Sequence, residues 1–477
     1  MATTPLRSRK AVLLFKIETT AGVDAAPTLS NAVYVEVSGA PVQPSAQRIQ
    51  TNYVAGSLDK SASLLSGVSC TMSFTIPVAS AQPPGVVPDW DSIMQVCGFT
   101  AGVATRTALV SAASTISFTS GSPCTIGDSG SGLAAATIGT VIYVLDPNGV
   151  NSGEYLVTAS AAGSLSVTKT DGTAAGITTQ AAGAGFPITI SYGVPGTVIA
   201  ATSGSTTGFT GGAAFTGTVN LYRHMPVLFS TSPVTPAWSF ISNYTAAKAA
   251  TIADLLGSAL TDTTKASIPA NVTYLPTSTS ANLKTGTAYL YVDGVCWQAV
   301  GLTGNWDVSN QTAQIGRMTF QLSGIYQAKI DAALPAYTAP TTNITPIMRA
   351  GSTLMNRIAA ACKSLTFKSN NQIVNPPNPN AVQGFDPGVI LSRKFEGAID
   401  PQDTLVATRD TMGDFINGYQ RILHCRYGSQ PGGRVGYLAP TAKYLSASPS
   451  NDGDMQRLSI NFECNGTDDN AFGFCVY

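Results

Sequence analysis

The chain has 477 residues, a net charge of zero and only 11% charged residues, together with 46 glycines and 28 prolines. This composition is too apolar for a disordered chain and is typical of an all-β protein with many turns. Without net charge the chain has no global field that attracts nucleic acid or an anionic membrane, and no apolar run is long enough to cross a bilayer.

The N-terminal segment joins a basic arm to a short apolar run. Arg7, Arg9 and Lys10 precede residues 11–15, which are too few for the hydrophobic region of a secretion signal. We therefore expect no export by that route. An apolar run so close to a terminus needs another surface to cover it.

Two strands and a helix are expected in the next hundred residues. Residues 31–37 and 68–78 predict strands, and the second carries its apolar side chains, Phe74 among them, on one face. Residues 41–66, between the two strands, predict a long polar loop, and loops of this length are usually functional or disordered. Residues 88–99 predict a short helix that Gly98 ends.

The composition changes near residue 101, where charged residues become scarce. Closely spaced short strands and turns predict a small β-domain at residues 103–200, inserted into a parent domain that resumes near residue 201. Residues 243–256 predict a helix that Gly257 follows.

The stretch from residue 285 to 327 predicts an antiparallel meander. Asp293-Gly294 is the strongest hairpin signal in the chain, because both central residues of a type I′ turn need positive φ. Gly304-Asn305 predicts a break, after which Trp306 begins another strand. Phe320 lies in a last strand that alternates polar and apolar residues.

The C-terminal part predicts a helix at residues 402–417 and further strands to the end. Asp400 is a suitable cap and Pro401 suits the first helical position. The apolar stripe expected on this helix consists of Leu405, Met412, Phe415, Ile416 and Tyr419. We predict that the core where sheet and helix meet contains Phe74, Trp306, Phe320 and Phe415.

No motif for catalysis, cofactor binding or metal binding is found. The eight cysteines are scattered without a C-x-x-C pair, and His224 and His424 are the only histidines. His424 and Cys425 are neighbours in a predicted strand, so their side chains point to opposite faces. Residues 127–130 (GDSG) match the surroundings of some protease serines, but a serine in a glycine-rich turn explains them. We predict no enzyme activity, no cofactor and no metal.

Acidic residues near the C-terminus allow a second reading for metals. Asp468 and Asp469, with Asp452 and Asp454, are oxygen donors of the kind that Ca²⁺ prefers. A solvated acidic turn is the simpler interpretation.

Several motifs, in their order along the chain, resemble the tail tube proteins of tailed bacteriophages. Residues 13–27 (LLFKIETTAGVDAAP) resemble the start of these proteins, and residues 88–99 resemble their short helix. Residues 286–326, with YVDG and SGIY, are similar to their central meander. The C-terminal order of SRKFEG (392–397), AP (439–440), DG (452–453), TDDN (467–470) and Phe474 is also similar. The resemblance covers about 1–100 and 284–477 and leaves the insert uncovered.

The resemblance implies a tail-tube-type β-sandwich with a flanking α-helix, interrupted by the inserted small β-domain. Its two parts would be residues 1–102 and 201–477. Subunits of such proteins close into rings, typically of six, that stack into a tube conducting DNA into the host without sequence-specific binding. The sequence leaves open whether six chains or three chains of a duplicated fold form the ring.

The resemblance also implies partners and a location. The partners are further copies of the chain and the tape-measure, tail-terminator and baseplate or tip proteins, with no membrane. The protein would be made in the bacterial cytoplasm and reside in the virion tail. We expect residues 1–16 and the 41–66 loop to stack rings on one another. The charged candidates for this contact are Arg7, Arg9, Lys10, Arg48, Asp59 and Lys60.

We expect the insert to project outward, since the lumen must stay open and the ring faces flat, and hence a non-contractile tail without a sheath. One alternative is a secreted or surface-exposed β-rich adhesin or surface-layer protein, which shares the Ser/Thr/Gly-rich composition. Another is a polysaccharide-active enzyme with paired carboxylates, for which only Asp386 and Glu396 suggest themselves.

Overall fold

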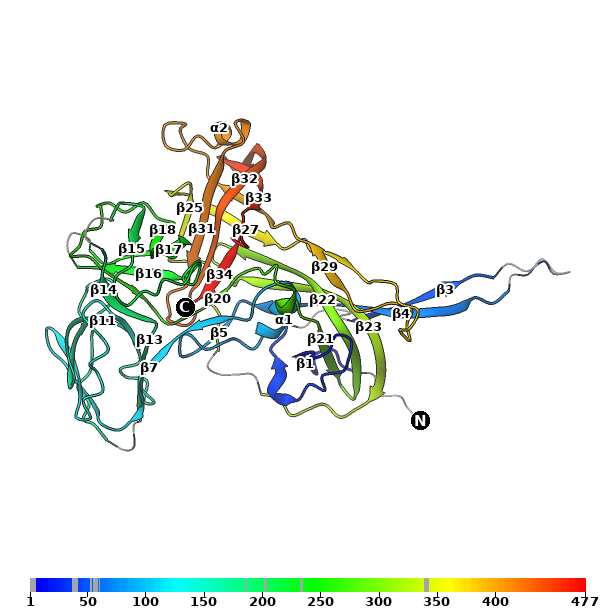
Figure 1. Cartoon of the computed structure of the whole chain (residues 1–477), viewed down its shortest axis with the longest axis horizontal. Coiled ribbons are helices and arrows are strands. Elements are labelled where there is room, and N and C mark those ends of the chain that lie inside the picture. The colour runs from blue at the N-terminus through cyan, green and yellow to red at the C-terminus, as the bar shows by residue number, and fades with distance from the viewer. Residues whose placement is uncertain are drawn as a thin grey trace.

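The computed structural model describes residues 6–36, 42–51, 54, 59, 61–183, 185, 187–200, 204–231, 235–338 and 343–477. About 50% of the chain is strand and 4% is helical, and the strands form several antiparallel sheets (Figure 1). The prediction of a mainly β protein is confirmed.

The first unit of the largest sheet combines two separate segments of the chain, residues 11–96 and 286–331. Its elements are β1 (Ala11–Ile17), β2 (Ala32–Val33), β3 (Val42–Ile49), β4 (Leu64–Pro77), α1 (Asp91–Val96), β21 (Gly286–Val292), β22 (Val295–Gln311) and β23 (Arg317–Asp331). The strands lie in the order β2-β1-β21-β22-β23-β4-β3, and every neighbouring pair is antiparallel.

A second unit of the same sheet follows. It consists of β25 (Ser352–Met355), β26 (Ile358–Ala359), β27 (Cys362–Lys368), β30 (Glu396–Pro401), α2 (Thr411–Ile416), β31 (Gln420–Tyr427), β32 (Val435–Asp452) and β33 (Met455–Asn465). The order is β26-β25-β31-β32-β33-β30-β27, again antiparallel throughout.

The two units have the same topology. Each consists of a first and a second pair of strands, a helix and a three-strand meander, arranged in the same spatial order. Their meanders share a β-bulge: Ala288 pairs with Ala299 in the first unit, Leu423 pairs with Ala439 in the second, and each bulge starts four residues from the hairpin. Since bulges are specific features of a strand pair, the match indicates one fold used twice.

The rest of the chain between α1 and β21 leaves the large sheet and returns through adjacent strands. β6 (Val103–Thr105) leads out and β20 (Asn271–Tyr274) leads back, and the two strands pair with each other. β20 also pairs with the C-terminal β34 (Gly473–Val476), which in turn pairs with β32.

Two further sheets make up this excursion, each with its own hydrophobic core. The first has the order β7-β13-β10-β11-β12-β9-β8, from β7 (Thr107–Ala113), β8 (Ile116–Thr119), β9 (Cys124–Asp128), β10 (Val141–Leu145), β11 (Gly153–Ala161), β12 (Ser164–Thr168) and β13 (Ile188–Tyr192). The second has the order β14-β19-β16-β17-β18-β15, from β14 (Val194–Val198), β15 (Gly208–Thr210), β16 (Pro226–Ser230), β17 (Ala237–Tyr244), β18 (Ala249–Ile252) and β19 (Lys265–Ile268). The described part of residues 201–268, which we assigned to the parent domain, belongs to this second sheet.

Four short strands and two 3₁₀ turns complete the described chain. β5 (Ser80–Ala81) pairs with β24 (Asn343–Ile344), and β28 (Gln372–Val374) pairs with β29 (Val389–Ser392). The 3₁₀ turns are η1 (Leu29–Asn31) and η2 (Ser280–Asn282).

Several predicted elements differ from the structure. The helix expected at 243–256 is wrong, because β17 and β18 pair across this segment. The helix expected at 402–417 covers only α2. Asp400 does not cap it, since its carboxylate accepts the backbone N–H groups of Lys363 and Ser364, and Asp410 caps α2 instead by accepting the Gly413 N–H.

Other strand boundaries also move. β22 continues through the break expected at Gly304-Asn305, since Gly304 packs against β23 where a side chain would clash with Gln321 and Leu322. The loop expected at 41–66 contains β3 and the start of β4. The strand expected at 31–37 is reduced to β2.

The main core lies under the large sheet and joins its two units. Phe74 stacks on Phe320 with ring centroids 5.8 Å apart, and Trp306 stacks on Phe474 at 5.6 Å. All four are buried. Phe415, which we expected with them, is only partly buried, because α2 lies at the edge of this core.

Candidate assembly surfaces

Eight strands of the large sheet form one unbroken path through both units. Each strand pairs with the next in the order β3-β4-β23-β22-β27-β30-β33-β32. The step between units is β22 to β27, where Asp307 lies opposite Lys368 and Gln311 opposite Ser364. The path is therefore a continuous wall rather than two separate sheets.

One face of this wall is apolar and the other is polar. Met72, Phe74, Phe320, Phe367 and Ile460 point into the core, and residues between them point the other way. Because directly paired residues share a face, the register defines the polar face. It includes Thr71, Ser73, Thr75, Ser309, Thr319, Gln321, Ser323, Thr366, Ser446, Ser448, Ser459 and Asn461.

The charged groups of the polar face are balanced. One row across the wall contains Asp307, Lys368, Glu396, Glu463 and Lys443 at directly paired positions. Burial raises the pKa of Asp307, and the nearby Lys368 acts against that shift. Neighbouring charges are also paired: Lys394 Nζ lies 2.6 Å from Glu396, and Arg317 Nε lies 2.9 Å from Glu36. The face therefore presents hydroxyls, amides and compensated charges.

Both ends of the wall have an unpaired strand edge within the described residues. β3 pairs only with β4, although its counterpart β27 pairs with both β30 and β22. β32 pairs with β31 up to Lys443, and beyond that residue only β33 accompanies it. Unpaired edges are sites for pairing with another chain.

β3 and the first part of β4 form an arm that extends from the body (Figure 1). Every residue from Gln43 to Ile49 is exposed. The exposed side chains of the arm include three large apolar ones, Ile49 (56%), Leu64 (60%) and Leu65 (63%). An isolated two-stranded hairpin is at best marginally stable in water. The arm therefore needs a partner surface.

The structure separates the charged residues predicted for ring stacking. Lys10 Nζ lies 3.4 Å from Asp293 in the β21–β22 turn, and the backbone N–H of Arg7 donates to the same carboxylate. Arg9 is exposed beside them. Arg48 lies in the arm, where its guanidinium reaches Ser63 at 3.5 Å.

The remaining two stacking candidates give less information. Asp59 is exposed, and Lys60 lies outside the described residues. The structure thus places the stacking candidates at two separate sites: Arg7 and Lys10 lie at the β21–β22 turn, and Arg48 lies in the arm.

A second exposed apolar surface lies at α2. Leu405 (79%) and Ile416 (76%) are largely exposed, as are Val406, Met412 and Tyr419. Of the stripe predicted to face the core, Leu405, Met412, Ile416 and Tyr419 are therefore exposed, and only Phe415 packs against the core. Figure 1 shows α2 at the tip of the molecule beside β32 and β33.

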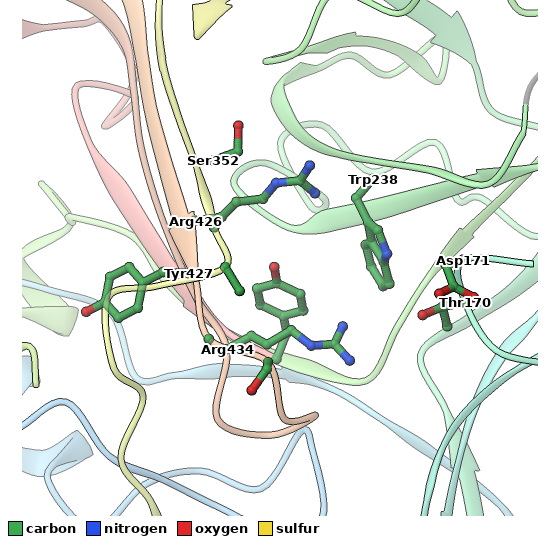
Figure 2. Close-up of a pocket in the computed structure, with 12 residues that line it drawn as sticks. Thr170, Asp171, Trp238, Ser352, Arg426, Tyr427 and Arg434 are labelled. Atoms are coloured by element: carbon green, nitrogen blue, oxygen red, sulfur yellow. The ribbon is translucent and has the colours of Figure 1, made fainter. Parts of the chain in front are cut away.

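A cavity of about 450 Å³ lies where the excursion meets the second unit. Figure 2 shows Trp238 of β17 and Thr170-Asp171 after β12 facing Arg426 and Arg434. Arg434 Nη2 lies 2.6 Å from Glu154 of β11, and its guanidinium lies 5.3 Å from the Trp238 ring centre. Burial acts to lower the pKa of Arg434, but Glu154 raises it overall. This contact fixes the excursion to the body.

The described ranges hold no candidate metal centre. No group of three or more metal-ligating side chains occurs there. His224 and His424 are buried, and burial lowers their pKa values to about 3 and about 4. The cysteines have no disulfide partner in this part of the chain. No helix among the described residues is long and apolar enough to cross a membrane.

Sequence reasoning missed the two free edges, although a signal existed. Pro44 lies in β3 and Pro449 in β32. Proline within an otherwise strand-like segment marks an edge strand, because it has no backbone N–H to donate to a neighbouring strand.

Comparison with protein-family models and with curated proteins found no match to this chain.

Proposed function

We propose that this protein is the structural subunit of a bacteriophage tail tube. Copies join through the free edges of the large sheet into rings, the rings stack, and DNA passes through the lumen into the host. The wall, with an unpaired edge at each end and one polar face, is the observation that carries this proposal. A tail-tube-type β-sandwich with a flanking helix is part of the same proposal.

The wall has the properties that a DNA conduit needs. A basic lumen would bind phosphates through counterion release and hold the DNA. The polar face instead carries hydroxyl and amide groups with paired charges, such as Lys394 with Glu396. We assign this face to the lumen, where it lets DNA pass without sequence-specific contacts.

Sheet extension uses the free edges of β3 and β32, whereas stacking uses the exposed arm, of which β3 is one strand, together with the N-terminal segment. Joining edges removes the aggregation hazard of β3 and β32. The arm and the N-terminal segment around Lys10 reach the next ring. The excursion, which lies opposite the arm in Figure 1, projects outside the tube, and a tail without a sheath leaves room for it.

The proposal also covers partners and place. Tape-measure, tail-terminator and baseplate or tip proteins are the further partners, and the virion tail is the location. No catalysis is required of such a subunit, and the two groups nominated for it have different partners: Glu396 pairs with Lys394 on the wall, whereas Asp386 accepts a hydrogen bond from Asn378 in a loop.

Negative-stain electron microscopy of the purified protein over a range of concentrations tests the proposal. We expect rings and tubes with an open lumen, more of them at higher concentration. Monodisperse monomers at every concentration would contradict the proposed function and favour a monomeric surface protein. Sedimentation of the same samples provides a matched measure of the fraction assembled.

A further inference from the structure

The cavity beside Trp238 continues into a second cavity along the joint between the excursion and the second unit. The second cavity has a volume of about 430 Å³ and shares Thr170, Asp171, Ser429 and Arg434 with the first, of about 450 Å³. Both volumes fall in the range of small-ligand pockets, about 300–1,000 Å³. We propose that the two cavities form one groove, the joint groove, which binds a short acidic saccharide.

The walls of the joint groove come from segments that are far apart in the chain. Ser352 of β25 and Arg426 of β31 are directly paired, so their side chains lie on the same face of the sheet. Trp238 of β17 lies between Arg426 and Asp171 in the view of Figure 2. Asp171 and Ser429 are exposed, so the groove is open to a ligand from solvent.

Several polar groups of the first cavity have no hydrogen-bond partner among the described residues. They are the Arg426 guanidinium, the Trp238 indole N–H and the hydroxyl groups of Thr170 and Ser352. All of them line the cavity, and Figure 2 shows them around one space. A few convergent polar groups beside an aromatic ring are typical of a ligand site.

The charges of the joint groove favour a ligand with negative groups. The charge of Arg434 is compensated by Glu154, whose Oε2 lies 2.6 Å away. Arg426 in the first cavity and the exposed Lys169 in the second form no ion pair within the part of the chain that the structure describes. Each cavity therefore offers one cation to a ligand, and a guanidinium matches the two oxygens of a carboxylate.

Asp171 distinguishes a saccharide from a bare anion. Its Oδ1 accepts hydrogen bonds from the N–H and the hydroxyl of Thr173, at 2.9 and 2.6 Å, while its Oδ2 has no partner among the described residues. This carboxylate repels an inorganic anion but accepts hydrogen bonds from sugar hydroxyl groups.

Trp238 provides the apolar part of the same recognition. The half-buried indole lines the first cavity, and the C–H groups of a sugar ring can pack against it. A neutral saccharide would leave Arg426 and Lys169 unpaired. A saccharide with one carboxylate on each unit uses the cations, the hydroxyl groups, the free carboxylate oxygen and the aromatic ring together.

Saturation-transfer NMR of the full chain with four probes tests the ligand class. The probes are trigalacturonate, a hyaluronan tetrasaccharide, the neutral maltotriose and acetate. We expect transfer to at least one of the two acidic saccharides and much weaker transfer to maltotriose and acetate. Equal binding of maltotriose or acetate would overturn the proposal, and so would the absence of binding by both acidic saccharides.

Two variants locate the binding in the groove. Arg426→Gln should weaken binding of the acidic saccharide at least about tenfold, because it removes a charge-assisted hydrogen bond. The matched control Arg9→Gln removes an exposed arginine of the N-terminal segment and should bind as the wild type does. Asp171→Asn, at an exposed position, should weaken saccharide binding without weakening that of acetate. Unchanged saccharide binding in both groove variants would overturn the site.

Tryptophan fluorescence gives an independent readout of the same site. Of the four tryptophans, Trp90 and Trp306 are fully buried, which leaves Trp238 and Trp297 to respond to a ligand. The change on adding the acidic saccharide should be absent in Trp238→Phe and present in Trp297→Phe. The reverse result would place the ligand elsewhere. None of these measurements requires rings or tubes, so failure here leaves the proposed function standing, and failure to assemble leaves the joint groove standing.

Discussion

Arg434 and Glu154 form an ion pair 2.6 Å long although 280 positions separate them in the chain. Their side chains are only 12% and 5% exposed. Arg434 precedes β32 in the repeated sheet, and Glu154 belongs to the seven-stranded sheet of the excursion. The pair therefore holds together two parts of the molecule that have separate cores.

Replacing one partner of this pair should lower the free energy of unfolding more than replacing both partners. Arg434→Met leaves the Glu154 carboxylate buried without its partner, and we expect a loss of about 3–5 kcal/mol in the free energy of unfolding. The double variant Arg434→Met/Glu154→Gln should recover much of that loss, because no uncompensated charge remains. Denaturant unfolding of the wild type and the variants measures the difference. Equal losses for the single and double variants would show that packing, not charge, matters at this contact.

The two histidines predict a loss of stability in acid. Burial lowers the pKa of His224 to about 3 and that of His424 to about 4, below the ordinary value near 6.5. Between these pKa values and about pH 6.5, both histidines are protonated in the unfolded chain but neutral in the folded chain. The contribution of each histidine is complete above about pH 6.5 and is lost as the pH falls towards the folded value, by on the order of 2 kcal/mol per histidine at pH 5.

Comparing unfolding at pH 7 and pH 5 tests this. The double variant His224→Gln/His424→Gln should lose about 4 kcal/mol less than the wild type over that interval, whatever its stability at pH 7. The same pH dependence in both proteins would assign acid sensitivity to the carboxylates.

Removal of residues 2–10 should abolish stacking without unfolding the subunit. The deletion removes Arg7 and Lys10, which contact Asp293, but leaves β1 paired with β21. We expect single rings in place of tubes and an unfolding midpoint close to that of the wild type. Tubes of normal length and yield would show that this segment is not the contact between rings.

Excision of the seven-stranded sheet should leave ring formation intact. Thr107 and Tyr192 pair directly where that sheet begins and ends, so a short Gly/Ser linker can replace residues 108–191. We expect rings and tubes of unchanged bore that lack part of their outer density in micrographs. Failure to close rings, with the shortened chain still folded, would place this sheet in the contact between subunits.

Thiol labelling distinguishes the lumen from the outer surface. Gln321→Cys places a thiol on the polar face of the wall, and Asp171→Cys places one on the excursion. A bulky maleimide should label both variants when subunits are dissociated, but only the second at full rate once long tubes have formed. Equal labelling of both in tubes would show that the polar face is not enclosed.

Local signals in the sequence predicted local structure well. The turn at Asp293-Gly294 and the helix that Gly98 ends depend on neighbouring residues, and both form where expected. The helix expected at 402–417 fails for a non-local reason. Backbone groups of Lys363 and Ser364 occupy the Asp400 carboxylate, and only the fold brings them there.

The repeat could not be read from the sequence for a related reason. Counterpart residues share a position and an orientation but not an identity: Ala288 corresponds to Leu423 at the bulge, and Val292 to Tyr427 at the hairpin. Strand pairing needs only alternation of polar and apolar side chains and a bulge at the right place. Pairing of β22 with β27 is what reveals the unpaired edges of β3 and β32, and it appears only in three dimensions.

β6 and β20 pair where the chain leaves the large sheet and returns to it, and we call this pair the neck. The backbone enters and leaves the excursion through two adjacent strands, in which Thr105 lies beside Asn271. Gain, loss or exchange of everything beyond that neck leaves the remaining backbone path unaltered. The position therefore suits insertion of a foreign domain with closely spaced termini, which the proposed tube would display once per chain.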